Sequence, residues 1–222
     1  MSTNQEVPTL EQTLEKTGFG HMINENKKLI LVLGAIVIAM ILAYSVFVQV
    51  SATKAQEKLD EIYVVESSVF STYLEGKSDM TAFKAGLAGI TDDYIASPVL
   101  VPPFLAAINK LEDENGIDEA VMMSVEKWLG KLHKTDYLYL FMALRVSALY
   151  EDQGDSKKAI SLLEGLSAQK SDLLKDKVSY ELGRLYLSEG NKADAQSKFD
   201  AVLKDYPDSE YAKLAKMYMG GL

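Results

Sequence analysis

The chain has 222 residues, a formal net charge of −9 and no cysteine. Without cysteine it has no structural disulfide, no thiol nucleophile and no zinc site with Cys ligands, and two histidines leave little for a histidine-based site. Residues 1–28 hold three Lys and four Glu, so the segment after Val50 carries 20 basic and 28 acidic residues, a net charge of −8. This charge disfavours binding to nucleic acid.

An uncharged apolar run of 22 residues extends from Leu29 to Val50. At about 1.5 Å per residue it forms a helix of roughly 33 Å, enough to cross a hydrocarbon core of about 30 Å. A cleaved signal peptide is the alternative, but this run exceeds the usual ~7 to 15 residues and the preceding arm is long and partly acidic. We predict an N-terminal arm at 1–28 and a transmembrane helix at 29–50 that contacts the lipid bilayer.

Lysines on the two sides of the apolar run indicate its orientation. Three of them precede it and two follow it, in the order Lys16, Lys27, Lys28, Lys54 and Lys58. Because positive charge is retained on the cytoplasmic side, this asymmetry predicts a cytoplasmic N-terminus. In a bacterium the chain would be a single-pass inner-membrane protein with a periplasmic C-terminal domain.

Beyond the membrane the pattern is helical throughout. Apolar residues at spacings of three and four continue as a helical stalk over 51–75, which ends at Gly76. No stretch shows the sustained alternation of a strand, so the predicted fold class is all-α. Prolines at 98, 102 and 103 interrupt the helices. The predicted helices are 80–95, 104–115, 118–132, 136–152, 156–168, 173–188, 192–205 and 209–218.

The last complete hairpin carries the residues of a known repeat. They are Leu182, Gly183, Tyr186, Gly190, Ala195, Phe199, Val202 and Pro207. This pattern resembles the tetratricopeptide repeat, whose motif places large, small and aromatic residues at these positions. A shift of 36 residues pairs Tyr186 with Tyr150 and Ala195 with Ala159, which indicates a second unit upstream.

The predicted repeat domain therefore covers 76–222. Its best repeats lie at about 140–173 and 176–209, a capping helix lies at 209–218, and two weaker hairpins are built around Ala120 and Ala82. Small residues let two helices approach closely and aromatic residues fill the space between hairpins. Because each hairpin alone leaves an apolar face exposed, stacking into an α-solenoid is required.

No constellation of catalytic or metal-binding groups is present in the sequence. His133 has no partner at metal-ligand spacing, and the acidic runs at 92–93 and 112–114 lack the spaced ligands of a calcium loop. A phosphate-binding glycine loop and a nucleophile elbow are also absent. We predict no enzymatic activity, no catalytic residue, no cofactor, no metal and no small-molecule substrate.

A partner surface is predicted from the repeat register. The first helices of successive hairpins line the concave face of such arrays, and the 36-residue shift places Phe141 above Lys177 and Leu144 above Tyr180. The candidate partner-binding residues are Phe141, Leu144, Lys177, Tyr180 and Arg184. A segment with apolar side chains and some acidic character suits them. Packing between helices is the alternative for Phe141 and Tyr180.

The whole architecture is similar to that of the YfgM family of bacterial inner-membrane proteins. Residues 24–28 before the membrane and Glu75-Gly76-Lys77 in the first hairpin's turn look like the equivalent segments of that family. The resemblance implies an ancillary subunit of the Sec translocon that cooperates with a membrane-anchored periplasmic chaperone for exported proteins. The alternative hypothesis is a structural scaffold of another envelope complex, in secretion, division or outer-membrane assembly, without client binding.

Overall fold

The computed structural model describes residues 26–95 and 97–220, so nearly all of the predicted N-terminal arm at 1–28 lies outside the described residues. Within the described ranges the chain is helical and contains no strand, which confirms the predicted all-α class. The elements are α3 (Lys27–Val65), the π-helix η1 (Glu66–Ser71), α4 (Thr72–Leu74), α5 (Met80–Ala88), α6 (Asp92–Ile95), α7 (Val101–Asp113), α8 (Glu119–Lys131), α9 (Tyr137–Asp152), α10 (Ser156–Ser167), α11 (Lys175–Ser188), α12 (Lys192–Asp205) and α13 (Glu210–Met219).

The chain divides into two compact units, residues 1–60 and Glu61–Leu222. The described part of the first unit contains α3 as far as Asp60, and the apolar side chains between Leu29 and Val50 are exposed. The helix that runs from Lys27 through Leu74 has the length and hydropathy needed to cross a membrane. This agrees with the long apolar helix that the sequence predicts at its N-terminal end.

A π-helical turn lies in the helix that opens the second unit. η1 begins at Glu66, the polar residue that interrupts the apolar pattern of the predicted stalk. The Ser71 hydroxyl donates a 2.8 Å hydrogen bond to the Glu66 carboxylate, and the turn buries Phe70 in the core. The helix ends at Leu74, one residue before the predicted end of the stalk.

Four turns of the second unit have the same geometry and divide it into hairpins. Each contains a residue in the left-handed region, with φ of 73° at Gly76, 54° at Asn115, 77° at Gly154 and 79° at Gly190. In each turn the next residue donates its N–H to the carbonyl five positions earlier, at Lys77 to Thr72, Gly116 to Leu111, Asp155 to Tyr150 and Asn191 to Tyr186. This is the helix-ending hydrogen bond that a left-handed residue permits.

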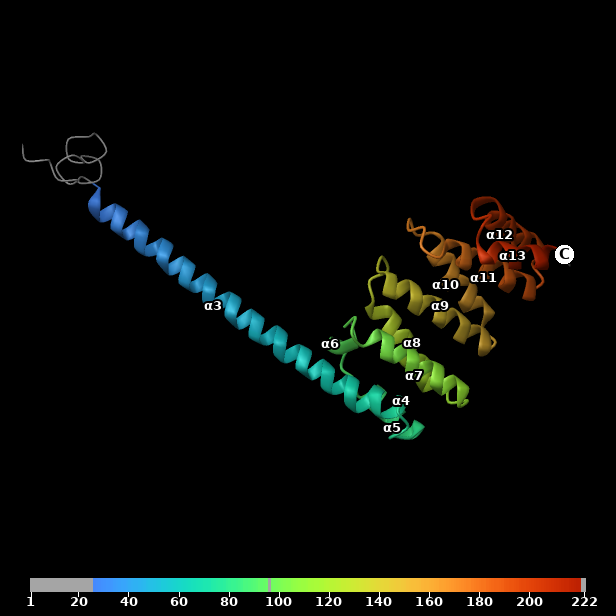
Figure 1. Ribbon diagram of the computed structural model, residues 1–222, viewed down its shortest axis with the longest axis horizontal. Helices are drawn as coiled ribbons and strands as arrows, with labels where there is room; N and C mark the ends of the chain where they lie inside the picture. The colour runs from blue at the N-terminus through green and yellow to red at the C-terminus, as the bar shows by residue number, and fades with distance from the viewer. Residues whose placement is uncertain (1–25, 96, 221–222) are drawn as a thin grey trace, which may run out of the picture. The chain divides into compact units, whose positions relative to one another are not determined.

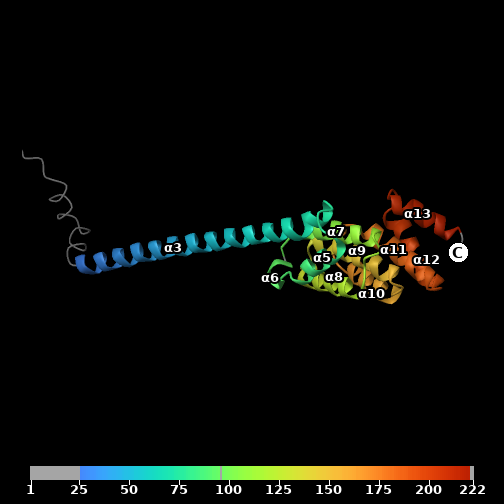
Figure 2. The same cartoon turned by 90° about the horizontal axis from the view of Figure 1, so that it is seen from below.

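Three residues at the spacing i, i+4, i+7 are buried along the second helix of each hairpin, the third one in the first hairpin, Ile90, lying just after the end of α5. The four sets are Phe83, Leu87 and Ile90; Val121, Val125 and Trp128; Ala159, Leu163 and Leu166; and Ala195, Phe199 and Val202. The hairpins are therefore η1–α4 with α5, α7 with α8, α9 with α10, and α11 with α12. Figure 1 shows them following one another in chain order up to α13, and Figure 2 shows the same order from below.

The two weaker hairpins differ from the prediction in register. Ala82 and Ala120, around which they were expected to be built, are exposed, and the buried residues are the next ones, Phe83 and Val121. The small-residue position of the repeat motif is filled here by larger side chains. A register anchored on alanine is consequently wrong by one residue in both hairpins.

The predicted helix at 80–95 is also wrong, because the chain forms two short helices there. α5 ends at Ala88, with Gly89 as its C-cap, and α6 starts at Asp92. Glycine is a poor helix former, and the Thr91 carbonyl accepts the N–H groups of Tyr94 and Ile95 in the new turn. Further along, Pro102 and Pro103 lie inside the first turn of α7, where an N–H group is not needed.

Two apolar cores stabilise the hairpins. The larger contains an aromatic cluster in which the Phe104 ring stacks on Trp128 at 4.1 Å between centroids and Phe70 contacts Trp128 edge-on at 6.0 Å. The smaller joins Phe199 and Tyr180 to the buried alanines of α13, which lies against α11 and α12 as the capping helix is expected to do.

Candidate protein-binding groove

A groove of about 420 Å³ is lined by residues of α9 and α11, the first helices of two successive hairpins. α9 contributes Phe141, Leu144, Arg145, Ala148 and Glu151, and α11 contributes Lys177, Glu181 and Arg184. Both sets follow the spacing of three and four residues that places side chains on one helical face. The rest of the lining is Ser147, Leu163 of α10, Leu174 just before α11, Leu185 and Tyr211 of α13.

One end of the groove is apolar. Phe141 is 47% exposed there, and Leu144, Leu174 and Tyr211 are half-buried. Leu174 adopts the left-handed region, with φ of 55° and ψ of 21°. That conformation costs a residue with a Cβ atom roughly 1 to 2 kcal/mol, so the fold retains an apolar side chain here against a backbone penalty.

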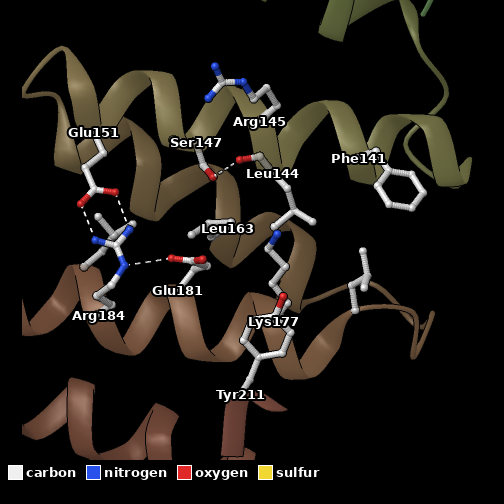
Figure 3. A pocket seen from close by; sticks show the side chains of 13 residues that line it. Phe141, Leu144, Arg145, Ser147, Glu151, Leu163, Lys177, Glu181, Arg184 and Tyr211 are labelled. Carbon is white, nitrogen blue, oxygen red and sulfur yellow. Dashed lines mark hydrogen bonds and ion pairs between the residues drawn. The ribbon is translucent and has the colours of Figure 1, made fainter. Parts of the chain in front are cut away.

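The other end of the groove is closed by an ion-pair cluster. The Arg184 guanidinium donates to both carboxylate oxygens of Glu151, at 2.6 and 2.5 Å, and to Glu181 at 3.0 Å. These hydrogen bonds hold the pKa of Glu151 below its usual range and raise the pKa of Arg184. Figure 3 shows this cluster at one end of the groove and Phe141 at the other.

Polar contacts join α7 to α9, α9 to α11 and α11 to the capping helix α13. Arg145 forms an ion pair with Glu112 of α7, and Arg184 pairs with Glu151 of α9. The Ser209 hydroxyl, at the N-cap of α13, donates a 2.6 Å hydrogen bond to Asp176 of α11. The two members of each pair are 33 residues apart in the sequence, three fewer than the 36-residue shift between the last two repeats.

The structure places four of the five predicted partner-binding residues in the groove, namely Phe141, Leu144, Lys177 and Arg184. Tyr180 lies elsewhere. It is only 8% exposed and its ring packs 6.2 Å from Phe199 and 5.5 Å from Tyr211 between ring centroids, so the packing alternative holds for this residue.

Sequence reasoning did not assign Arg145, Glu151, Leu174, Glu181 and Tyr211 to the groove. Glu181 has a usable signal, because it lies one helical turn before Arg184, whereas the 36-residue shift places Ala148 rather than Glu151 above Arg184. Leu174 has no such signal, since its position depends on the left-handed conformation that ends the loop between α10 and α11.

The acidic runs of the sequence are used in ion pairs. Asp92 contacts Lys127 and Lys131, each at 2.7 Å, and hydrogen bonds from these two lysines lower its pKa to about 2. Glu112 pairs with Arg145. Over the part of the chain that the structure describes, no group of three or more His, Cys, Asp or Glu side chains is arranged to hold a metal ion.

Comparison with known proteins supports the repeat assignment. The sequence profile described as the tetratricopeptide repeat matches residues 150–217. The fold is similar to that of a tetratricopeptide repeat protein from Parabacteroides merdae, with a TM-score of 0.52, 18% sequence identity and coverage of 71% of this chain. This chain spans 58% of the length of that protein. No curated protein matches the sequence.

The fold and the groove together define a class of protein. The chain has a tetratricopeptide-repeat fold preceded by a long apolar helix. Repeats of this type form protein–protein interaction modules, in which stacked hairpins present an extended concave surface to a partner.

Proposed function

We propose that this protein is a membrane-anchored protein-binding module of the bacterial envelope, which acts as an ancillary translocon subunit or a chaperone-like factor for exported proteins. The observation that carries the proposal is an open groove with Phe141 exposed at its apolar end, in a chain that also has a helix able to cross a membrane. The resemblance to the YfgM family supports the translocon as the partner.

The proposed topology makes a direct prediction. Ser171 is exposed in the loop between α10 and α11, and the chain has no cysteine of its own. In intact cells whose outer membrane has been permeabilised, a Ser171→Cys variant should react with a membrane-impermeant maleimide, whereas a Ser2→Cys variant should react only after lysis. Gel-shift of the labelled protein measures both. The opposite pattern would reverse the orientation.

Crosslinking in living cells tests the proposed function. A photoreactive amino acid replaces Phe141 inside the groove or, as a control, Lys157, which is exposed on α10 and does not line the groove. We expect crosslinks from position 141 to translocon subunits and to many different exported proteins. Crosslinks to one fixed set of subunits in constant ratio would instead support the scaffold hypothesis, and equal products from both positions would contradict binding in the groove.

A further inference from the structure

Lys177 differs from the other cations of the groove. Arg145 is paired with Glu112, and Arg184 is held by Glu151 and Glu181. Lys177 also lines the groove, and among the described residues its ammonium group has no carboxylate within ion-pair distance. Figure 3 shows it extending from α11 toward Leu144 of α9. An ammonium group in this position is free to bind an anion that enters the groove.

Within the described part of the chain, Lys177 is the cation of the groove whose charge is left without a partner. The lining has three cations, Arg145, Lys177 and Arg184, and two carboxylates, Glu151 and Glu181. Both carboxylates are bound to Arg184, and Arg145 is paired with Glu112 outside the lining. Charge complementarity therefore favours a partner with a negative group.

Lys177 shares its part of the groove with apolar side chains, and Glu181 lies one helical turn further along α11. Leu144, Leu174 and Tyr211 lie at the same end of the groove, with the exposed Phe141 beyond them. Leu174 contributes its side chain to the lining from a left-handed backbone conformation. An ion pair formed at this end is screened by less water than one on an open surface, and apolar side chains of the partner gain contact area beside it.

We propose that the groove recognises an internal acidic side chain, Asp or Glu, flanked by apolar residues of a peptide segment, with Lys177 binding the carboxylate and Phe141, Leu144 and Leu174 contacting the apolar neighbours. This assignment rests on the proposed function of the groove as a protein-binding surface. It gives Arg184 a different role from the one that the sequence indicates, since its donors already serve Glu151 and Glu181 and close the groove at the far end.

A side-chain carboxylate fits this end of the groove better than a C-terminal one. A chain terminus presents its carboxylate together with the adjacent backbone amide, and its recognition requires several hydrogen-bonding groups close together. The lining contains no Asn or Gln, and it includes the apolar Leu144 and Leu174 together with Lys177. One cation among apolar groups matches one acidic side chain among apolar residues.

Selection of peptides by the full-length protein in lipid nanodiscs tests the proposal. Two random peptide libraries are used, one inserted between folded domains of a display protein and one ending in a free carboxyl terminus. We expect the internal library to yield peptides with Asp or Glu beside two apolar residues. Fluorescence anisotropy should show that Lys177→Glu binds such a peptide about tenfold more weakly, as for the loss of a charge-assisted hydrogen bond.

Lys213→Glu is the matched control. Lys213 is exposed on α13 and does not line the groove, and its replacement by Glu changes the net charge by the same amount as Lys177→Glu. The Lys213→Glu variant should bind the acidic peptide as the unaltered protein does, whereas peptide selection with the Lys177→Glu variant should enrich basic peptides. The absence of enrichment, enrichment without acidic residues, a preference confined to free carboxyl termini, or equal binding by Lys177→Glu would each overturn the proposal.

Phe141→Ala separates this proposal from the function on which it rests. If Phe141→Ala weakens peptide binding and Lys177→Glu does not, the groove remains the binding surface and the role of Lys177 is refuted. If neither variant weakens binding, the proposed function of the groove is refuted as well. Thermal unfolding of each variant, followed by circular dichroism, establishes that a loss of binding does not come from a loss of fold.

Discussion

Replacing Trp128 by alanine is expected to destabilise the repeat domain by about 3 to 5 kcal/mol. The indole is 1% exposed, stacks on Phe104 with an interplanar angle of 11° and contacts Phe70 edge-on. Its removal deletes the largest side chain of the aromatic cluster and leaves a cavity that the neighbouring helices cannot fill without moving. Chemical unfolding of the full-length protein in detergent, followed by far-ultraviolet circular dichroism, measures the change in free energy.

Met123 on the same helix provides the control. It is 65% exposed, so Met123→Ala should change the free energy of unfolding by no more than about 0.5 kcal/mol. Trp128→Phe, which keeps an aromatic ring in the cluster, should fall between the two alanine variants. Equal stability of Trp128→Ala and Met123→Ala would contradict the arrangement of η1, α7 and α8 around this residue.

Replacing Gly183 by alanine should also destabilise the domain, by about 1 to 3 kcal/mol. A Cβ atom on Gly183 would lie 2.5, 2.7 and 3.0 Å from three carbon atoms of the Phe199 ring, so α11 and α12 would have to move apart. The close contact explains why the repeat motif has glycine at this position. The measurement is the midpoint of thermal unfolding of the full-length protein in detergent.

Gly165 of α10 is a matched control, because a Cβ atom there has no heavy atom within 4 Å. Alanine is the better helix former, so Gly165→Ala should be neutral or stabilise by up to about 1 kcal/mol. In addition, Phe199→Leu should recover part of the stability lost in Gly183→Ala, since it removes ring atoms from the contact. A loss of the same size in both glycine variants would show that Gly183 does not lie against α12.

The last hairpins are the part of the fold that sequence reasoning predicts best. The helix predicted at 192–205 has the bounds of α12, because Gly190 fixes the turn before it and the motif fixes its buried face. Local signals of this kind, a left-handed glycine and small residues at a helix contact, act over a few residues and are visible in the sequence. The same signals are weaker in the hairpin of α7 and α8, because the left-handed residue of its turn is Asn115 and not a glycine, and its first buried position on α8 holds Val121 and not an alanine.

The groove was predicted less completely, because its properties depend on contacts between hairpins. The 36-residue shift treats the first helices as identical, yet Tyr180 contacts Phe199 rather than the groove. Its place three residues before Gly183 is a signal for this, since the glycine marks the face that packs on α12. The neutralisation of Arg184 by Glu151 depends on how closely α9 and α11 approach, a distance that periodicity does not give.

The two apolar cores differ in size, and this difference bears on which end of the repeat domain unfolds locally first. The larger core extends from Ile62 to Leu185, whereas α12 and α13 pack in a separate small cluster around Phe199. In a repeat array each unit is stabilised by its neighbours alone, so we expect the C-terminal end to open locally at a lower free energy than global unfolding requires. Tyr211 belongs both to that small cluster and to the groove. A segment bound in the groove should therefore oppose this opening, so that occupancy of the groove and order at the C-terminal end are thermodynamically linked.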